Sequence, residues 1–523
     1  MTTRRAALAA GAAALALPAA AQITTLDLAG AALPPRPDDW TAAGHRREVL
    51  IRWGDRVTFD APPWDPRNPA PEAAAAQFGW DARIAGAVVP PVAADGVPRL
   101  VLAVAHPELD PAMAWPGGHE RPALAAAMSG VSLLNLERQG GRWVLVDGGF
   151  QSRHLGIGTL CRFGGAAAPA RGVQGLVGVG GGCATPWGTL LLAESGATAW
   201  LPRLAALDPR FAEAPRFGWV AEIDALDPQA VPTKRAALGR IGAAAVAAGV
   251  AADGRAVVFL ADGRPQGFLY RFVSAGPAAE PDALDAGTLQ VARAEGEAIR
   301  WLALPDAAAP GPAAMADQAG GSAFDTPAAL ALDPRRPRLL LACRAGGGRA
   351  ETRTDHLNPR AGAHPGHVVE ITGDLAAERQ AARVLFLAGD AAEGGSYGRG
   401  QPAGAVPRHP ATLAVDARGR LWIGTDGAGR PGAAPDAVFG CDLDGPGRGV
   451  VLPLYAAPRA AGIGGALPTP DGEALLVAVR RPGAEPGATF DRPATRWPAF
   501  DPRTPPRSAV LTVARNAGGA VGG

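Results

Sequence analysis

The chain has 523 residues, of which 50 are basic and 49 are acidic, so its formal net charge is +1. This balance creates no long-range field that would draw the protein to nucleic acid or to an anionic membrane surface. Hydrophobic residues make up 48% of the chain, which excludes intrinsic disorder.

The N-terminus has the pattern of an export signal. Arg4 and Arg5 precede an apolar run over residues 6–17, and a small-residue cleavage site follows at 19–21. The run is too short to span a bilayer. We therefore interpret residues 1–21 as an export signal, of the twin-arginine or the general secretory type, and expect a periplasmic or extracellular protein without a membrane span.

Short β-type runs recur along the rest of the chain, and several follow a tight turn such as Asp253-Gly254 or Asp471-Gly472. Turn–strand units in a chain rich in Gly and Pro predict an all-β fold, a single β-propeller of about six blades with loop and short-helix insertions. Two β-sandwiches are the alternative. The predicted strands lie at 100–105, 131–136, 143–147, 189–193, 256–260, 339–343, 421–424 and 474–479. Short helices are predicted at 122–128 and 202–207, and loops at 304–322, 391–408 and 484–506.

One segment combines two residue types that bind transition metals. Residues 183–189 read C-A-T-P-W-G-T, and Glu194 follows a short apolar run. A thiolate and a carboxylate can both ligate a metal ion, although a buried cysteine beside a turn is the plainer interpretation. The other cysteines (Cys161, Cys343 and Cys441) are too widely spaced to predict a disulfide pairing.

Two further motifs carry weaker signals. His356, His364 and His367 share one loop with Asp355, and imidazoles could gather a metal there, although solvated histidines are the commoner case. Residues 394–398 match G-x-S-x-G, but no strand and helix flank the serine as a nucleophile elbow requires, so a loop is expected.

The chain resembles the PhoX-type alkaline phosphatases. The resemblance rests on 183–189 with Glu194 and on a series of motifs in common order. That series is 52–55, 78–80, 130–132, 234–240, 267–274, 358–360, 366–367, 419–427, 469–472 and 506–508. It implies a propeller, here over residues 22–523, with an iron and calcium cluster at its axis that hydrolyses phosphate monoesters. Cys183 matches the family's iron-ligating cysteine, and Glu194 matches a conserved acidic position.

The sequence also departs from the family pattern where acidic or amide side chains are expected. The departures lie at Ala243-Ala244, Pro327-Ala328, Arg344-Ala345, Pro410-Ala411 and Gly462. A calcium ion takes six to eight oxygen ligands, so these losses predict an incomplete cluster. We expect Cys183 and Glu194 near the axis, with Ala244, Ala328 and Ala411 facing the same space.

These departures favour weak or lost phosphatase activity in a divergent member of the family. The alternative function is a non-catalytic propeller that binds a small anionic ligand or a partner in its axial pocket, with Arg240 and Arg344 as candidate anion-binding residues. A structural envelope protein is the third interpretation. The expected ligand is a small phosphorylated or anionic molecule, and the expected state is a monomer.

Overall fold

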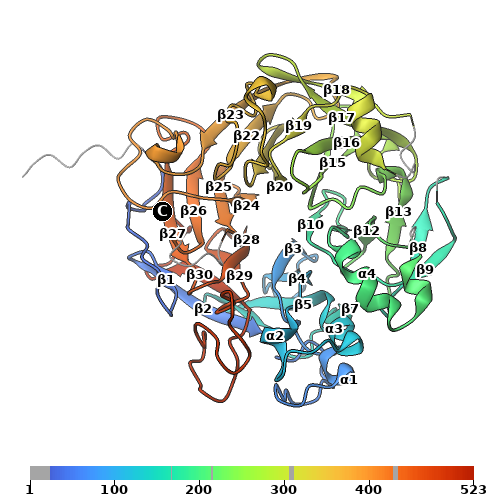
Figure 1. Cartoon of the computed structure of the whole chain (residues 1–523), viewed down its shortest axis with the longest axis vertical. Coiled ribbons are helices and arrows are strands. Elements are labelled where there is room, and N and C mark those ends of the chain that lie inside the picture. Colours follow the sequence, from blue (N-terminus) through green and yellow to red (C-terminus); the bar gives the residue numbers. More distant parts are fainter. Residues whose placement is uncertain (1–23, 167, 214–215, 306–310, 428–433) are drawn as a thin grey trace, which may run out of the picture.

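The computed structural model describes residues 24–166, 168–213, 216–305, 311–427 and 434–523. The fold is all-β, with many strands and few short helices, and its sheets stand around a central axis (Figure 1). The predicted export signal, residues 1–21, lies outside the described residues and stays a prediction.

The sheets are built mainly from antiparallel meanders in which consecutive strands pair, while the pairing of β13 with β8 is parallel. The first sheet contains β3 (Arg83–Val88), β4 (Arg99–His106), β5 (Gly130–Gln139) and β6 (Arg142–Leu145), and β7 (Arg153–Leu155) pairs with β5. The second sheet contains β10 (Gly181–Ala184), β11 (Leu190–Ala193), β12 (Val220–Ile223) and β13 (Thr233–Arg235), and it is extended by β8 (Leu160–Gly164) and β9 (Gly172–Gln174).

A ten-stranded sheet follows, and the pairing of β18 with β23 joins its two halves. The first half is β14 (Ala245–Val250), β15 (Arg255–Ala261), β16 (Gly267–Pro277), β17 (Gly287–Ala294) and β18 (Ala298–Ala303), with β19 (Ala323–Phe324) on β16; the second is β20 (Pro327–Leu332), β21 (Arg338–Cys343), β22 (His367–Thr372) and β23 (Arg379–Leu387).

Strands from near the two ends of the chain complete the last two sheets. The strand β2 (His45–Arg52) pairs with β30 (Ala509–Arg515), so residues more than 450 positions apart share a sheet. The same sheet contains β28 (Gly462–Pro468) and β29 (Ala474–Arg480). The last sheet contains β24 (Pro410–Val415), β25 (Arg420–Thr425), β26 (Ala437–Asp442) and β27 (Val451–Ala456), with β1 (Trp40–Thr41) paired to β27.

The innermost strands form a closed ring around the axis. Each contacts the next in the cyclic order β3, β10, β14, β20, β24, β28 and back to β3. Because each of these strands begins its meander, all six enter the ring from the same side of the molecule. We call the end of the axis where the inner strands begin the strand-start end, and the opposite end the strand-finish end. Different side chains lie at these two ends.

The turns expected from the sequence connect inner strands to their second strands. Gly254, Gly419 and Gly472 have φ values of 85°, 81° and 68°, a conformation that other residues adopt only with strain. The second strands β15, β25 and β29 are almost wholly buried, which explains their continuous apolar sequences. Each predicted strand coincides with or overlaps a strand of the structure.

The helices are short and lie outside the ring of inner strands. The helix α3 (Pro122–Met128) is where the sequence predicts one. Two predictions need correction: α4 (Ala197–Ala205) begins before 202–207 and contains Pro202, and α5 (Pro312–Gln318) lies within the predicted loop 304–322. The others are α1 (Pro71–Ala74) and α2 (Pro111–Ala114). No described helix is long and apolar enough to span a membrane.

Candidate functional site

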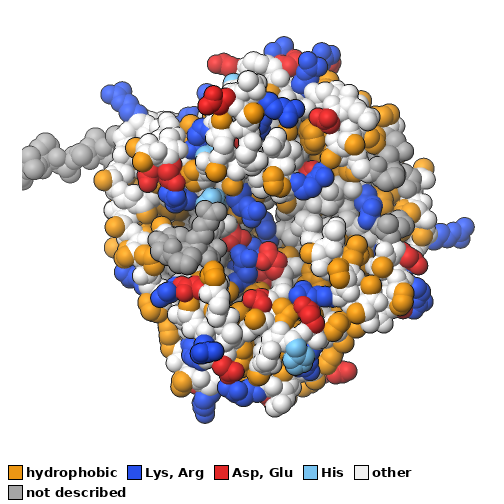
Figure 2. Space-filling model, viewed as in Figure 1, with side chains coloured by type: hydrophobic (Ala, Val, Ile, Leu, Met, Phe, Trp, Pro, Cys, Tyr) orange, Lys and Arg blue, Asp and Glu red, His pale blue; other side chains and the backbone are white. Residues whose placement is uncertain are grey.

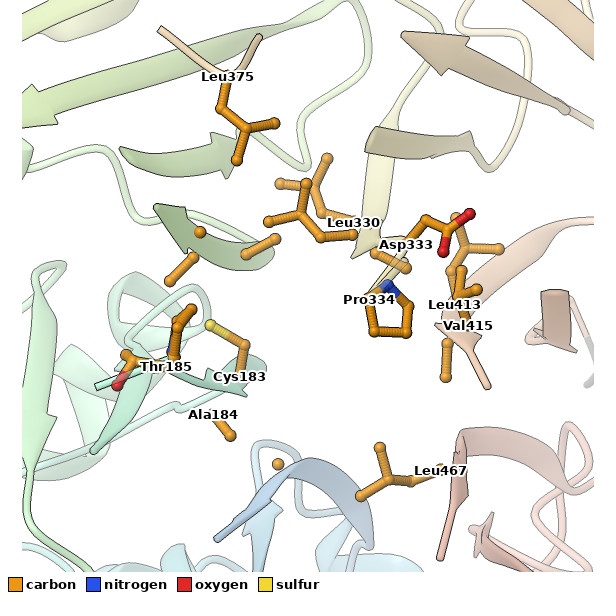
Figure 3. A pocket seen from close by; sticks show the side chains of 18 of the residues that line it. Cys183, Ala184, Thr185, Leu330, Asp333, Pro334, Leu375, Leu413, Val415 and Leu467 are labelled. Atoms are coloured by element: carbon orange, nitrogen blue, oxygen red, sulfur yellow. The ribbon is translucent and has the colours of Figure 1, made fainter. Parts of the chain in front are cut away.

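A cavity of about 870 Å³ follows the axis toward the strand-finish end (Figure 3). Its walls come from the middle and last residues of the inner strands, including Leu330, Leu413 and Leu467. Small aliphatic side chains dominate this lining, because the inner strands present Ala, Gly, Leu and Val to the axis. A wall of this kind offers few ligands to a metal and few donors to an anion.

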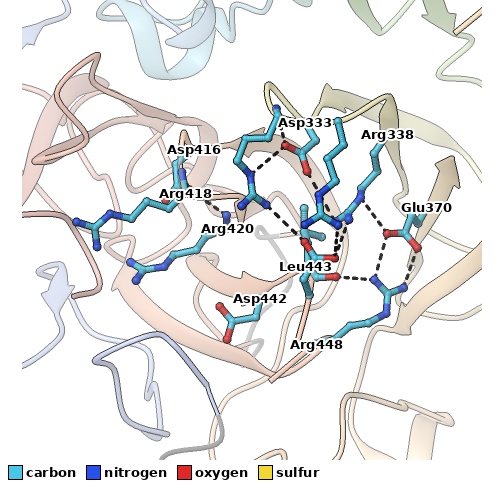
Figure 4. Close-up of polar contacts among 12 residues, drawn as sticks. Asp333, Arg338, Glu370, Asp416, Arg418, Arg420, Asp442, Leu443 and Arg448 are labelled. Carbon is cyan, nitrogen blue, oxygen red and sulfur yellow. Dashed lines mark hydrogen bonds and ion pairs between the residues drawn. The ribbon is translucent and has the colours of Figure 1, made fainter. Parts of the chain in front are cut away.

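The charged groups at the rim of this cavity are already paired. Asp444 accepts ion pairs from Arg335, Arg336 and Arg338 at 3.5, 3.2 and 2.7 Å, as part of the network in Figure 4. Glu370 binds Arg338, Arg383 and Arg448 in the same network. The strand-finish end therefore presents few unpaired charges to a ligand.

Cys183 lies in the wall of the cavity, on β10. Burial raises the pKa of its thiol to about 12, and the nearby carboxylate of Glu222 acts in the same direction. All four cysteines are free thiols. Because metal ligation and nucleophilic attack both require the thiolate, Cys183 is poorly prepared for either without a cation beside it.

This raised pKa predicts slow, pH-dependent labelling of Cys183 by a thiol reagent. It is partly exposed, whereas the other three cysteines are buried, so it should react first. At pH 8 the rate should be roughly 10³-fold below that of an unperturbed cysteine of pKa ~8.5, and it should rise about tenfold per pH unit. Mass spectrometry of labelled protein measures this, with Cys183→Ser as the control. Fast labelling at pH 7 would contradict it.

Glu194 is wholly buried, and protein donors surround its carboxylate. Lys234 Nζ lies 2.9 and 3.0 Å from the two oxygens, and both side chains have no exposed surface. The backbone amides of Val177, Gly218 and Trp219 donate to the same oxygens at 3.2, 3.1 and 3.2 Å. A metal ion could reach this carboxylate only by displacing the lysine.

The strand register also separates Glu194 from Cys183. Gly181 pairs with Ala193, and Cys183 pairs with Leu191. Glu194 therefore lies opposite Gly180, and three residues of a strand span about 10 Å. Ligation of one ion by both residues stays a prediction, and this register does not favour it.

The remainder of the motif around Cys183 has a structural role. Trp187 Nε1 and Thr189 Oγ1 donate to Glu222 Oε1 at 2.8 and 2.6 Å, and Arg235 pairs with Glu222 Oε2 at 2.7 Å. These contacts fix the turn between β10 and β11 against β12 and β13.

A cluster of charged side chains lies at the strand-start end, and we call it the arginine cluster. It comprises Asp81, Glu108, Asp426, Arg480 and Arg481. Arg480 ends β29 and is 2% exposed, and its guanidinium binds Asp81 at 2.6 Å, Glu108 at 3.0 Å and Asp426 at 2.5 Å. Arg481 binds Glu108 at 2.6 Å and Asp426 at 2.7 Å. Charged side chains gather at the centre of the face in the view down the axis (Figure 2).

The pKa shifts in the arginine cluster express this mutual pairing. Burial alone would raise the pKa of Glu108, but Arg480 and Arg481 outweigh it and lower the pKa to about 2. The pKa of Asp426 is lowered for the same reason. Burial would lower the pKa of Arg480, yet its three carboxylate partners raise it. The two arginines thus favour the ionised forms of Glu108 and Asp426.

Arg83 lies beside this cluster and links two inner strands of the ring. It begins β3, and its Nη2 donates to the backbone oxygen of Ala411 at 3.3 Å. Ala411 belongs to β24, and β28 lies between these two strands in the ring. Burial and the neighbouring Arg480 lower the pKa of Arg83 to about 10. Within the described chain, no carboxylate forms an ion pair with Arg83, so its cationic group can accept an anionic partner.

Two of the family departures border the arginine cluster. A Cβ atom at Gly462 would overlap Asp426 Oδ1, with Arg481 Nη2 at 3.5 Å. Ala411 contributes the carbonyl that binds Arg83. Ala328 is in β20, and Ala244 directly precedes β14. These residues thus belong to inner strands or adjoin them, but they do not line the cavity that holds Cys183, so a space shared by all of them stays a prediction.

The two arginines proposed from sequence lie in different surroundings. Arg240 Nε donates to the Phe217 oxygen at 2.7 Å, and burial lowers its pKa. Arg344 follows β21, and its backbone N–H donates to the Thr326 oxygen at 2.9 Å. No partner of the Arg344 guanidinium is found among the described residues. Arg344 is therefore the better placed of the two to bind an anion.

A second group could hold a metal ion. Ligand atoms of Asp325, His364 and His367 lie within 4.8 Å of one another, and all three side chains are buried. The two ring nitrogens of His367 lack a hydrogen-bond partner within the described structure. Asp325, however, already binds Arg349 at 2.9 Å and His364 Nε2 at 3.1 Å. His356, the third histidine of this loop, is not part of the group.

His364 limits how this group could bind a metal. The Gly366 N–H donates to its Nδ1 at 3.2 Å, so in the neutral ring Nε2 carries the proton and donates to Asp325. A metal at Nε2 would have to displace that proton. The three residues could hold one transition-metal ion, but their present contacts are those of a buried ion pair.

Sequence reasoning missed Asp81, Arg83, Glu108 and Asp426 as site residues. Asp81 and Arg83 lie at the start of β3, whereas Glu108 follows β4 and Asp426 follows β25, and no sequence spacing links these three places. The only sequence signal was the pair Arg480-Arg481, which ends an apolar strand where a charge is costly to bury. The loop 394–398 is structural, since Ser396 forms a β-bridge with Leu387.

Comparisons with known proteins agree on one family. The family model described as alkaline phosphatase PhoX matches residues 29–483. The structure of Pseudomonas fluorescens PhoX in complex with vanadate, a transition state analogue, matches with a TM-score of 0.85 and 25% identity, over 95% of this chain and 100% of that chain. No curated protein sequence matches significantly.

Other solved structures match much more weakly. A gluconolactonase, XC5397 from Xanthomonas campestris, gives a TM-score of 0.28 at 12% identity, over 86% of this chain and 98% of that one. A family AA12 carbohydrate-active enzyme from Trichoderma reesei gives 0.31 at 9% identity, over 75% and 96%.

Proposed function

The chain belongs to the PhoX family of alkaline phosphatases, and we propose that it is a divergent member that binds a small phosphorylated or other anionic molecule at the strand-start end of its axis. In this proposal, metal-dependent phosphomonoester hydrolysis is weak or lost.

The observation that carries the proposal is the unpaired cationic group of Arg83. Its guanidinium reaches past β28 to β24, is desolvated by burial, and donates one hydrogen bond to a neutral carbonyl. An arginine presents several donors in a fork that matches phosphate or carboxylate oxygens. Arg344, which follows β21, supplies a second candidate donor.

The iron and calcium cluster implied by the family resemblance does not fit the residues at the axis. The carboxylates of Asp81, Glu108 and Asp426 are bound to Arg480 and Arg481, and Glu194 is bound to Lys234. A multinuclear cluster of hard cations needs several free carboxylates. Among the described residues that line the axial cavity, Asp333 is paired with arginines, and Asp374 is the carboxylate without an ion pair. We therefore derive no catalytic step through such a cluster.

A retained phosphatase activity is the second candidate function. Its support is the close match to a PhoX structure with a bound transition-state analogue, together with the group Asp325, His364 and His367, which could hold a single transition-metal ion. The test that separates the two candidates is a turnover assay, which the Discussion describes.

Two finer features complete the proposal. The two halves of the ten-stranded sheet are joined through the pairing of β18 with β23, so we count each half as one blade. We therefore infer six blades in all, one for each strand of the inner ring. We also propose export to the periplasm or the cell exterior, on the sequence pattern of residues 1–21.

Anion binding is tested by titrating phosphate into the protein in a calorimeter, with a phosphomonoester as a second ligand. Replacing Arg83 with Met keeps the apolar stem and removes the donors. A charge-assisted hydrogen bond contributes about 1.5–3 kcal/mol, so Arg83→Met should weaken binding by roughly 10- to 100-fold. The matched control is Arg503→Met, because Arg503 is 87% exposed and pairs with Asp501. Unchanged binding in Arg83→Met, or no binding by the wild type, would reject the proposal.

A further inference from the structure

Three carboxylates from distant parts of the chain converge on the guanidinium of Arg480. Asp81 lies just before β3, Glu108 just after β4, and Asp426 just after β25. Arg480 approaches Asp81 with Nε at 2.9 Å and Nη2 at 2.6 Å, Asp426 with Nη1 at 2.5 Å, and Glu108 with Nη2 at 3.0 Å. One cation therefore lies at the point where three acidic side chains meet.

Arg481 holds the remaining oxygens of two of these carboxylates. It binds Glu108 Oε2 at 2.6 Å and Asp426 Oδ1 at 2.7 Å. Together, Arg480 and Arg481 carry the charge of one divalent cation. They also contact all six carboxylate oxygens of the three acids, and six is the smallest number of oxygen ligands that a calcium ion takes.

Two glycines of β28 pack closely against the arginine cluster. A Cβ atom on Gly464 would lie 2.0 Å from the Ala82 oxygen and 2.8 Å from Cγ of Arg480. A Cβ atom on Gly462 would overlap Asp426. The backbone of β28 thus leaves room for the aliphatic stem of Arg480 and for the Asp426 carboxylate.

We propose that Arg480 and Arg481 take the place of one divalent cation, so that Asp81, Glu108 and Asp426 form a hard-cation site that is held closed by two internal guanidinium groups. Removing the two positive charges leaves the buried carboxylates of Asp81 and Asp426 and the half-exposed carboxylate of Glu108 without their ion-pair partners, with Arg83 as the neighbouring cation, and a bound metal ion would stabilise that state. The inference goes beyond the proposed anion binding and does not depend on it.

The experiment compares the wild type with the double variant Arg480→Gln/Arg481→Gln. Terbium luminescence, sensitised by Trp80 next to Asp81, reports binding, and calcium competes for the same position. The wild type should give no saturable signal from this position. The double variant should bind calcium at least tenfold more tightly than the wild type, and calcium should raise its melting temperature.

Two controls make the signal specific. The terbium signal of the double variant should disappear in a Trp80→Phe background while calcium still raises the melting temperature. Arg503→Gln removes an exposed arginine outside the cluster and should behave as the wild type. A folded double variant that does not respond to calcium would overturn the inference, as would tight calcium binding at this position in the wild type.

A single variant decides the case in which the double variant does not fold. Arg481 is more exposed than Arg480, at 26% against 2%, so Arg481→Gln should fold. It removes one of the two charges, and calcium should raise its melting temperature by more than that of the wild type. No calcium effect on Arg481→Gln would reject the inference, whereas failure of the anion proposal would appear in the phosphate titrations of the wild type and Arg83→Met.

Discussion

The protein without residues 1–21, loaded with iron and calcium, is expected to hydrolyse a generic phosphomonoester weakly or not at all across alkaline pH. The carboxylates that could hold hard cations at the axis are neutralised by Arg480, Arg481 and Lys234. Metal ions supply several kcal/mol of transition-state stabilisation in phosphoryl chemistry, so their absence should lower turnover by roughly 10³-fold or more relative to a metal-loaded enzyme.

The measurement is release of p-nitrophenol or phosphate, with the metal content determined on the same sample. Less than one equivalent each of iron and calcium should remain after purification. Cys183→Ala is the matched variant, and its residual rate should equal that of the wild type. Robust turnover that disappears in Cys183→Ala would refute this expectation and restore the family's enzymatic activity to this chain.

The strands that sequence reasoning found are largely one kind of strand. The predictions at 100–105, 189–193, 256–260, 339–343, 421–424 and 474–479 fall on β4, β11, β15, β21, β25 and β29, each the second strand of its meander. These strands have neighbours on both edges and are covered on both faces, so nearly every residue is apolar. The turns before them, such as Asp253-Gly254, add a local signal.

Inner and outer strands were harder to recognise from sequence. The inner strand β14 has the sequence A-V-A-A-G-V, and its small residues face the axial cavity. Its run of alanine and glycine carries little strand propensity, so the sequence does not distinguish it from other buried segments. The outer strand β23 alternates buried and exposed residues, and so lacks a continuous apolar sequence.

The charged site could not be predicted because it exists only after the ring closes. Asp81 and Arg480 are 399 positions apart, yet they form two hydrogen bonds. The ring brings the beginning of β3 beside the end of β29, and sequence spacing carries no trace of this contact. The family resemblance predicts the loss of carboxylates at the axis. The structure shows that the carboxylates of the arginine cluster are bound to Arg480 and Arg481.

Glu194 illustrates the same limit within a single motif. Its position after an apolar run is compatible with a metal ligand, and the sequence alone leaves that role open. The structure pairs it with Lys234, which is the only lysine among 50 basic residues. Lys234 also donates to the Arg216 oxygen at 2.9 Å and lies 4.9 Å from the ring centre of Phe217. This lysine is therefore a structural residue whose loss should be costly.

Lys234→Met is expected to destabilise the fold by about 3–5 kcal/mol, since it leaves a buried carboxylate without its cation. Such a loss is a large part of the ~5–15 kcal/mol that stabilises a typical domain. Methionine keeps the length of the side chain and its contact with Phe217, so the change isolates the charge. Urea unfolding followed by tryptophan fluorescence measures the effect.

The double variant Lys234→Met/Glu194→Gln separates the loss of the ion pair from the loss of packing. If the unpaired carboxylate causes the instability, the double variant should be more stable than Lys234→Met, because it removes the buried charge as well. Equal or lower stability would indicate that packing around Lys234 dominates. If calcium or iron restored the stability of Lys234→Met but not of the double variant, Glu194 would be free to ligate a metal once the lysine is gone, and the metal role predicted for Glu194 would then describe a site that Lys234 blocks in this chain.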